Sequence, residues 1–157
     1  MVDAKPFNLG QTLAEVDDIV RIQAEQSGLQ LYTDHDDVHD ADLLGSALYL
    51  KKILVNLYSN AIKYNKDGGS VAVAVGRDGP DAVVTVADTG IGIPPEHQGR
   101  VFERFYRVDK SHSKASGGTG LGLSIVKHAV AYHHGTVTLD SREGEGTTFI
   151  LRLPLEA

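Results

Sequence analysis

Apolar residues recur every three to four positions in three stretches of the chain, a period typical of amphipathic helices. The first stretch covers residues 11–26 and ends at Gly28, and its expected core-facing positions are Leu13, Val16, Ile19, Val20 and Ile22. The second covers residues 46–65, with an expected apolar face of Leu50, Leu54, Leu57, Ala61 and Tyr64. The third is expected to be capped by Gly135, and one of its faces comprises Leu121, Ile125, Ala129 and Tyr132.

Alternating apolar and polar residues predict strands between and after these helices. The expected strands cover residues 71–75, 82–87, 136–140 and 147–153, with a candidate at 29–33 and a short extended segment at 6–9. Residues 76–81 form a short turn-rich connection, which favours an antiparallel hairpin that a doubly wound parallel sheet would not contain. The alternation implies one covered sheet face and one wetter face. We therefore expect an α+β fold with helices layered on one face of the sheet.

Composition narrows the class of protein. The 157 residues are 41% apolar and contain no Pro/Ser-rich linker or repeat, so residues 1–157 are expected to form a single domain. A net charge of −6 without a basic run disfavours nucleic acid as a partner. The chain has no cysteine, which fits a reducing cytoplasm, and no apolar run approaches the roughly 20 residues of a membrane span. The aspartates of residues 34–42 are interpreted as a solvated loop and not as a metal site.

A second stripe of the helix at residues 46–65 is polar. Asn56, Asn60 and Lys63 follow one another at four- and three-residue spacing, about 100° around the helix axis from Leu57. Asparagine inside a helix costs about 0.5 kcal/mol relative to alanine, so two on one face suggest a ligand. Carboxamide oxygens suit Mg²⁺, and a lysine one turn further on suits the phosphates that accompany it. A solvated helix edge is the alternative, and the helix pattern alone leaves both open.

Asp88 follows the strand expected at residues 82–87. Because side chains alternate along a strand, Asp88 lies on the same side as Val86, where the sheet buries apolar residues. A carboxylate that faces a buried surface needs a hydrogen-bond donor. Gly90 and Gly92 allow tight backbone next to this carboxylate. An ordinary turn, in which the aspartate caps nearby amides, is the alternative interpretation.

A cluster of glycines at residues 117–122 directly precedes the third helical pattern. Glycines that open a helix favour phosphate, because backbone N–H groups and the helix dipole both point at a ligand there. The segment is not a Walker A loop, since no Gly-Lys-Ser/Thr follows, and the GxGxxG dinucleotide pattern is also absent. A flexible linker before a helix is the alternative for these glycines considered alone.

Taken in order, these motifs resemble those of the ATP-binding catalytic domain of sensor histidine kinases, in the superfamily that also includes DNA gyrase, Hsp90 and the MutL proteins. Residues 56–64 are similar to the family's N box, 88–93 to its G1 box, 102–107 to its F box and 118–123 to its G2 box, and residues 144–147 complete the pattern. The resemblance covers nearly the whole chain. It implies a Bergerat-type fold, a two-layer α/β sandwich with a mixed, mostly antiparallel sheet.

The resemblance also implies roles for individual residues. Asn60, helped by Asn56, would hold Mg²⁺ against the triphosphate of ATP, and Lys63 would contact phosphate. Tyr64 would pack beside the nucleotide. Asp88 would accept a hydrogen bond from the adenine amino group, which gives the inward carboxylate its donor and discriminates adenine from guanine.

Other nucleotide-binding residues implied by the resemblance come from the remaining boxes: Gly90, Gly92, Ile93, Phe102, Gly118, Thr119, Gly120, Leu121, Gly122, Leu123 and Thr147. Arg107 and Lys110 lie in the segment that forms a mobile lid in this family, and both are candidates for neutralising the transferred γ-phosphate. Lys114 is a weaker candidate. Phe102 and Phe105 correspond to the hinge and docking surface by which the lid meets a partner domain, and Thr147 is expected to support the adenine end.

One position distinguishes the branches of the superfamily. In the gyrase pattern, a glutamate that activates water lies four residues before the metal-binding asparagine, and here that position is Asn56. A carboxamide cannot act as a general base, so ATP hydrolysis should be slow and the γ-phosphate kept for another acceptor. In the kinase family that acceptor is a histidine on a separate dimerisation domain. None of the seven histidines of this chain stands in such a context, so each is interpreted as a surface or packing residue.

The resemblance therefore implies an incomplete enzyme: the catalytic, Mg-ATP-binding part of a two-component sensor kinase. Its implied partners are the histidine-bearing dimerisation domain of the same kinase and a downstream response regulator, with the isolated domain expected to be monomeric. The abrupt start suggests the cytoplasmic part of a longer, membrane-anchored sensor. Two alternatives stay open: a nucleotide-regulated binding module, either a degenerate kinase or an anti-sigma-like protein, and a gyrase- or Hsp90-type ATPase.

Overall fold

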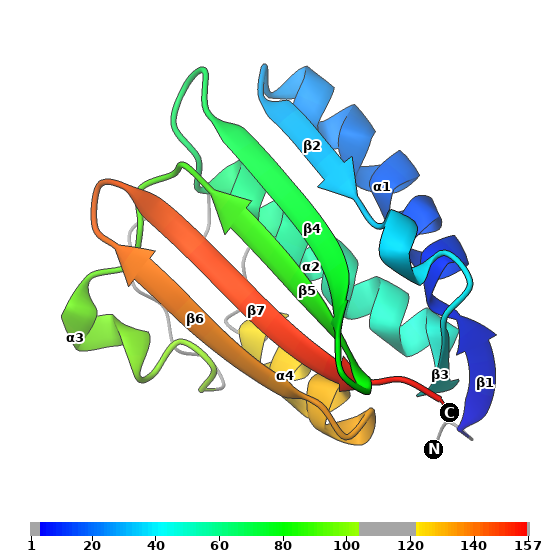
Figure 1. The fold of residues 1–157 in the computed structure, drawn as a ribbon. Coiled ribbons are helices and arrows are strands. Elements are labelled where there is room, and N and C mark those ends of the chain that lie inside the picture. Colours follow the sequence, from blue (N-terminus) through cyan, green and yellow to red (C-terminus); the bar gives the residue numbers. More distant parts are fainter. Residues whose placement is uncertain (1–3, 104–121, 157) are drawn as a thin grey trace.

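The computed structural model describes residues 4–103 and 122–156 (Figure 1). In chain order, the elements are β1 (Lys5–Asn8), α1 (Leu9–Gln26), β2 (Gln30–Asp34), the 3₁₀ turn η1 (Asp36–Val38), β3 (Asp42–Gly45), α2 (Ala47–Lys63), β4 (Ser70–Asp78), β5 (Asp81–Asp88), α3 (Pro95–Gln98), α4 (Gly122–Tyr132), β6 (Thr136–Arg142) and β7 (Gly146–Pro154). In this part of the chain no helix is long and apolar enough to cross a membrane.

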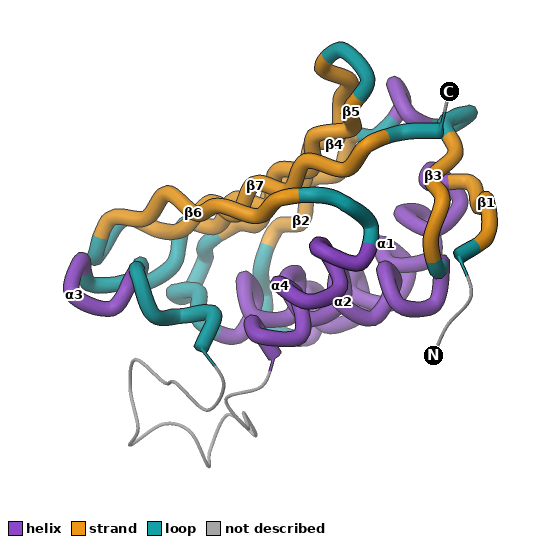
Figure 2. The backbone as a smooth tube through the Cα atoms, turned by 90° about the horizontal axis from the view of Figure 1, so that it is seen from below, coloured by secondary structure: helices purple, strands orange, loops and turns teal. Residues whose placement is uncertain are grey.

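A five-stranded sheet forms one layer, with the strand order β2-β4-β5-β7-β6. Only the β2–β4 pair is parallel, and the other three pairs are antiparallel, including the predicted hairpin between β4 and β5. Helices α1, α2 and α4 lie together on one face of this sheet (Figure 2). The expected α+β sandwich, with a mixed and mostly antiparallel sheet covered on one side, is therefore confirmed.

Strand alternation was predicted correctly because it depends only on local geometry. Val71, Val73 and Val75 of β4 are buried, as are Phe149, Leu151 and Leu153 of β7. In β7, the residues between these buried positions are half-buried. The covered face of the sheet thus carries a continuous apolar layer, against which the helices pack.

The buried stripe of α1 differs from the predicted one. Ile19 and Ile22 are 39% and 58% exposed, so their assignment to the core was wrong. The core-facing residues are Leu9, Thr12, Leu13, Val16, Asp17, Val20 and Ala24. Ile22 follows Val20 by two residues, or about 200° around the helix, which points it away from a stripe that already includes Val20. The helix also begins earlier than expected, at Leu9, because the Asn8 side chain accepts a hydrogen bond from the N–H of Gln11 at 2.7 Å.

Two other helix faces needed correction. Tyr64 is 41% exposed, because α2 ends at Lys63 and the chain turns away from the core there. In α4 the buried side chains are Ser124, Val126, Ala129 and Val130, followed by His133, whereas Ile125 and Tyr132 are only half-buried. The left-handed residue that ends α4 is His134, with a φ of 63°, and Gly135 then donates its N–H to Val130 O at 2.9 Å.

The segment interpreted as a loop at residues 34–42 contains a turn, η1, and the start of β3. Strand β3 pairs antiparallel with β1, so Asp42 lies opposite Asn8 in a separate two-stranded sheet. Four-residue strands of this kind have too short a pattern to be recognised without their partner. Among the described residues no group of three His, Asp or Glu side chains converges as a metal site.

Two polar side chains, Asp17 of α1 and Tyr58 of α2, are buried in the core. Asp17 accepts through Oδ2 from His35 Nε2 at 2.9 Å, but its Oδ1 and the hydroxyl of the fully buried Tyr58 have no partner among the described residues. Burial raises the pKa of Tyr58, and the nearby Asp17 carboxylate raises it further, so the phenol stays neutral.

We therefore expect Tyr58→Phe to stabilise the fold by about 1 kcal/mol, because it removes a desolvated hydroxyl without changing the packed ring. Chemical denaturation of both proteins measures the difference. Tyr32→Phe, at a residue 58% exposed, is the control and should change nothing. A loss of stability in Tyr58→Phe would contradict this view and would reveal a hydrogen-bond partner for the hydroxyl.

Candidate functional site

The polar stripe of α2 lies in the second half of that helix. Asn56 and Asn60 are half-buried and one turn apart, and neither side chain makes a hydrogen bond to the rest of the described chain. Lys63 is exposed in the last turn, and Tyr64 caps the helix. Two half-buried carboxamides without a partner among the described residues are available to a ligand.

Asp88 ends β5 directly opposite Thr147 of β7. Its Oδ1 accepts hydrogen bonds from the N–H of Gly90 at 2.9 Å and from the N–H of Thr147 at 3.2 Å. Within the described residues, Oδ2 accepts none. Burial raises the pKa of Asp88, and the two backbone donors oppose this only in part. The capping turn proposed as the alternative is therefore present through Oδ1, and the residue is half-buried at the end of β5.

The turn after Asp88 lies against the end of α2. Ile91 donates its N–H to Tyr64 O at 3.2 Å, and a Cβ on Gly90 would collide with the same carbonyl oxygen. Asn60 lies one helical turn before Tyr64. This contact therefore brings the carboxylate of Asp88 and the carboxamides of α2 to the same end of the molecule, although 28 residues separate Asn60 from Asp88 in the sequence.

A hydrogen-bonded triad fixes this junction. Asn65 donates through Nδ2 to Ser70 O at 2.9 Å and accepts through Oδ1 from the Thr89 hydroxyl at 3.2 Å. Thr89 Oγ1 in turn accepts from the N–H of Ser70 at 2.9 Å. The start of β4, the end of α2 and the residue after Asp88 are thereby held together. No role could be expected for these three residues from the sequence, because each has an ordinary residue type for its position until its partners are known.

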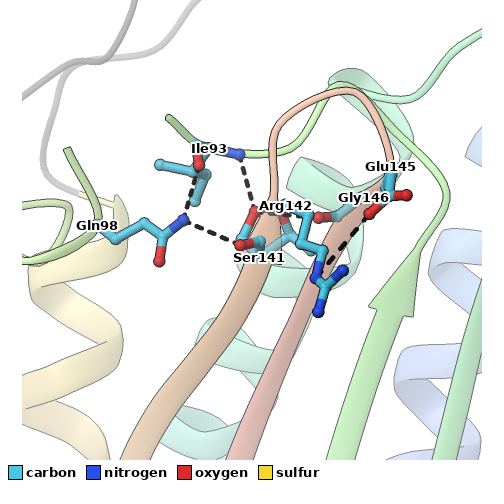
Figure 3. A network of polar contacts seen from close by, with 7 residues as sticks. Ile93, Gln98, Ser141, Arg142, Glu145 and Gly146 are labelled. Carbon is cyan, nitrogen blue, oxygen red and sulfur yellow. Dashed lines mark hydrogen bonds and ion pairs between the residues drawn. The ribbon is translucent and has the colours of Figure 1, made fainter. Parts of the chain in front are cut away.

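A second network attaches the G1 segment to the β6–β7 hairpin (Figure 3). Ser141 accepts through Oγ from the N–H of Ile93 at 2.8 Å, and Gln98 Nε2 donates both to Ile93 O at 2.8 Å and to Ser141 O at 3.0 Å. Ser141 Oγ also bonds Gly146 O at 3.0 Å and the Thr147 hydroxyl at 2.8 Å. Ser141 and Gln98 are further supporting residues that no sequence motif indicated.

The remaining predicted site residues that the structure describes do not take part in the side-chain hydrogen bonds of these two networks. Gly92 has a φ of 71° and a Cβ there would collide with Arg142 O, so glycine is required for both conformation and space. The half-buried Phe102 packs edge-on against Phe149 with ring centroids 6.1 Å apart. Gly122 and Leu123 begin α4. Arg107, Lys110, Lys114, Phe105, Gly118, Thr119, Gly120 and Leu121 lie outside the described residues.

The family to which this chain belongs is shown by a family model that matches residues 45–157. These residues comprise α2, the five-stranded sheet except β2, and α4. They match the family described as histidine kinase-, DNA gyrase B-, and HSP90-like ATPase. The chain belongs to this ATPase family, and an ATP-binding site is what the family shares. Within this family, the chain is similar to histidine kinases in sequence and in structure, so it is a catalytic domain of the histidine kinase type.

Two relatives in sequence are sensor proteins of bacteria. The chain is 45% identical over 134 residues to the sensor-like histidine kinase SenX3 of Mycobacterium tuberculosis, which is 85% of this chain and 32% of that protein. It is 39% identical over 147 residues to the phosphate regulon sensor protein PhoR of Pseudomonas aeruginosa, or 94% of this chain and 33% of that protein. The chain thus spans about a third of the length of these curated relatives.

Solved structures show the same fold. The catalytic domain of histidine kinase ThkA has a TM-score of 0.83 and 25% identity, and the match covers 98% of this chain and 96% of that chain. Full-length ShkA, solved in complex with AMPPNP, has a TM-score of 0.82 and 27% identity, covering 100% of this chain and 32% of its own. These matches confirm the resemblance to histidine kinase catalytic domains that the ordered motifs indicated.

Proposed function

We propose that this chain binds Mg-ATP and transfers its γ-phosphate to a histidine on a separate dimerisation domain. The main support for this proposal is the hydrogen bonding of Asp88. Its Oδ1 is already engaged by two backbone N–H groups, whereas Oδ2 accepts no hydrogen bond from the described protein. A partly desolvated carboxylate oxygen next to the glycine turn is matched by the exocyclic amine of adenine, which guanine lacks at that position.

The residues of α2 fit the other end of the nucleotide. Asn56 and Asn60 present, on one edge of the helix, two carboxamide oxygens that accept no hydrogen bond from the described residues, which suits a hard cation that still carries water and phosphate ligands. Lys63, one turn beyond, is exposed and fits phosphate. When bound, Mg²⁺ would neutralise charge on the β- and γ-phosphates, while these side chains hold the triphosphate in place.

Transfer, and not hydrolysis, is supported by Asn56. In the proposed step, the bond between the γ-phosphorus and the β–γ bridging oxygen breaks as an imidazole nitrogen bonds to phosphorus, and ADP leaves. Asn56 offers no base to deprotonate water, so the chain alone should release phosphate slowly. We place the activity in the cytoplasm, with the acceptor domain supplied by a longer sensor kinase. A structural neighbour, ThkA, has been solved with response regulator protein TrrA, and a response regulator is the downstream partner we propose here.

Isothermal titration of this chain tests the proposal. We expect ATP binding that weakens about tenfold when Mg²⁺ is removed with a chelator, because the carboxamides of Asn60 and Asn56 hold the triphosphate through the cation. Asn60→Ala should lower the affinity to that chelated level and should no longer respond to Mg²⁺. Gln26→Ala, which removes an exposed helical carboxamide of α1, is the matched control.

Radiolabelled ATP then separates the possible reactions. Mixed with a histidine-bearing dimerisation domain, the chain should place acid-labile phosphate on that domain, and Asn60→Ala should not. Nucleotide binding without any transfer would favour a nucleotide-regulated binding module. Rapid release of inorganic phosphate by the chain alone would favour a gyrase- or Hsp90-type ATPase. The absence of ATP binding by the wild-type chain would overturn the proposal altogether.

A further inference from the structure

His133 is the one histidine of the described chain that is almost fully buried, with 2% of its surface exposed. It follows the last residue of α4, and its ring lies among the rings of Phe7, Tyr49 and Tyr132, at centroid distances of 6.1, 6.3 and 5.1 Å. It does not belong to either hydrogen-bond network that supports Asp88. A buried polar ring at this position must therefore be explained by its own contacts.

Both ring nitrogens of His133 are hydrogen-bonded, and the partners fix the tautomer. Nδ1 lies 2.7 Å from Ala129 O, which can only accept, so Nδ1 carries the proton. Nε2 lies 3.1 Å from the backbone nitrogen of Ser46, which can only donate, so Nε2 accepts. The ring is neutral in this arrangement, and it connects the end of α4 with the residue that precedes α2.

Gly45 and Ser46, which precede α2, accommodate the ring of His133. Ser46 is the N-cap of α2, where its hydroxyl accepts from the N–H of Tyr49 at 3.2 Å, and its own N–H points at His133. Gly45 lies next to this ring, and a Cβ there would collide with Cδ2 and Nε2 of His133. Gly45 is not in the left-handed region, so the close approach of the ring is the reason for glycine at this position.

This contact lies at the far end of the helices from the nucleotide residues. Because the last turn of α4 meets the first turn of α2 and the two helices pack side by side, they run antiparallel. At 1.5 Å per residue, Gly122 lies about 16 Å from His133 along α4, and Asn56 lies about 15 Å from Ser46 along α2. The start of α4 is therefore level with Asn56.

We propose that His133 is a positioning residue for the phosphate end of the nucleotide site. By fixing α4 lengthwise against α2, its two hydrogen bonds set the place of Gly122 and Leu123 relative to Asn56 and Asn60. Asp88 is held differently, through β7 and the turn at Gly90, and has no part in this contact. Loss of the His133 contact should thus weaken binding of the triphosphate and leave binding of the adenine base intact. The inference rests on the proposed function of the same site.

The test compares two ligands across three variants. His133→Phe keeps a ring of similar size and removes the acceptor for Ser46 N–H, so Mg-ATP should bind about tenfold more weakly while adenosine affinity stays within twofold. His133→Gln offers a neutral acceptor at similar reach and should restore Mg-ATP binding to within about twofold of wild type. His128→Phe makes the same chemical change at an exposed position of α4 and should bind both ligands normally. Affinities are measured well below the melting temperature of the least stable variant.

Equal weakening of Mg-ATP and adenosine in His133→Phe would show a purely structural role and overturn the inference, as would unchanged Mg-ATP affinity. If His133→Phe does not fold, Gly45→Ala, whose Cβ would displace the same ring at Cδ2 and Nε2, carries the same expected selectivity and the same contrary outcomes. Failure of the wild-type chain to bind Mg-ATP would instead overturn the proposed function, so the two failures are distinguishable.

Discussion

Asp88→Asn should bind ATP about 100-fold more weakly than the wild-type chain and should nevertheless be the more stable protein at neutral pH. The affinity falls because the carboxamide places an NH₂ group at the Oδ2 position, where it faces the amine of adenine. Both groups are donors, so neither finds an acceptor, and the two unpaired groups cost about 1–3 kcal/mol of binding free energy. The carboxamide oxygen can still accept from the N–H groups of Gly90 and Thr147, so the turn itself is retained.

The gain in stability follows from the pKa of Asp88. Burial raises this pKa, so the folded protein binds the proton more tightly than the unfolded chain does. The contribution of the group to stability is fully present below the unfolded pKa and is lost as the pH rises through the folded pKa. Asparagine does not titrate, so the advantage of Asp88→Asn should be small at acidic pH and should grow as the pH rises through the raised pKa.

Calorimetric titration with ATP and thermal melts across this pH range measure the two effects. Asp140→Asn, at an exposed position of β6, is the control and should change neither. Unchanged ATP affinity in Asp88→Asn would remove the main support for adenine recognition at this carboxylate. A stability advantage that increases toward acidic pH would contradict the direction of the pKa shift.

Gly146→Ala should destabilise the fold by about 3 kcal/mol or more and should abolish ATP binding at temperatures where the chain is still folded. Gly146 has a φ of 133°, a conformation that side chains rarely adopt, and a Cβ there would collide with Asp88 O. The collision is with backbone, so no rotamer change relieves it. Strand β7 would have to move away from β5 at the point where Thr147 donates its N–H to Asp88.

Gly99→Ala is the matched control, since a Cβ at Gly99 meets nothing within 4 Å and its backbone is in the right-handed helical region. It should leave both stability and affinity close to wild type. Denaturant titration gives the stability difference, and ATP titration gives the second readout. If Gly146→Ala behaved like Gly99→Ala, the tight packing of β7 on Asp88 would be disproved.

The parts of the site that could be predicted from the sequence are those set by local periodicity. Asp88 was expected to face the core side because side chains alternate along a strand, and Asn56 and Asn60 were expected on one helix edge because 3.6 residues make a turn. Ser141 of β6 and Gln98 of α3 belong to no motif, and Thr89 has no role of its own within the segment similar to the G1 box, because a single serine, glutamine or threonine has no distinctive pattern. Their roles depend on Ile93, Asn65 and Ser70, which come from other elements.

The same limit explains the errors in the fold. Ile19 and Ile22 belong to an apolar pattern, yet α1 buries Asp17 in the core, where His35 from the segment after β2 satisfies one carboxylate oxygen. Periodicity cannot anticipate that a polar residue will be buried, because the partner that permits it is distant in sequence. Strand β3 was missed for the same reason, since its pairing partner β1 lies more than 30 residues earlier.

The sequence by itself determined the layered α+β fold, the order of the motifs similar to the N, G1, F and G2 boxes, and the absence of a general base at Asn56, because each depends on local spacing or on residue type. Only the tertiary structure decided that the turn after Asp88 contacts the end of α2 and that His133 joins α4 to the N-cap of α2. It also decided that position 146 requires glycine, because the carbonyl oxygen of Asp88 lies where a Cβ would be. These are contacts between elements that meet only when the sheet and helices pack. Their hydrogen bonds and close approaches therefore have no signature in any single stretch of the chain.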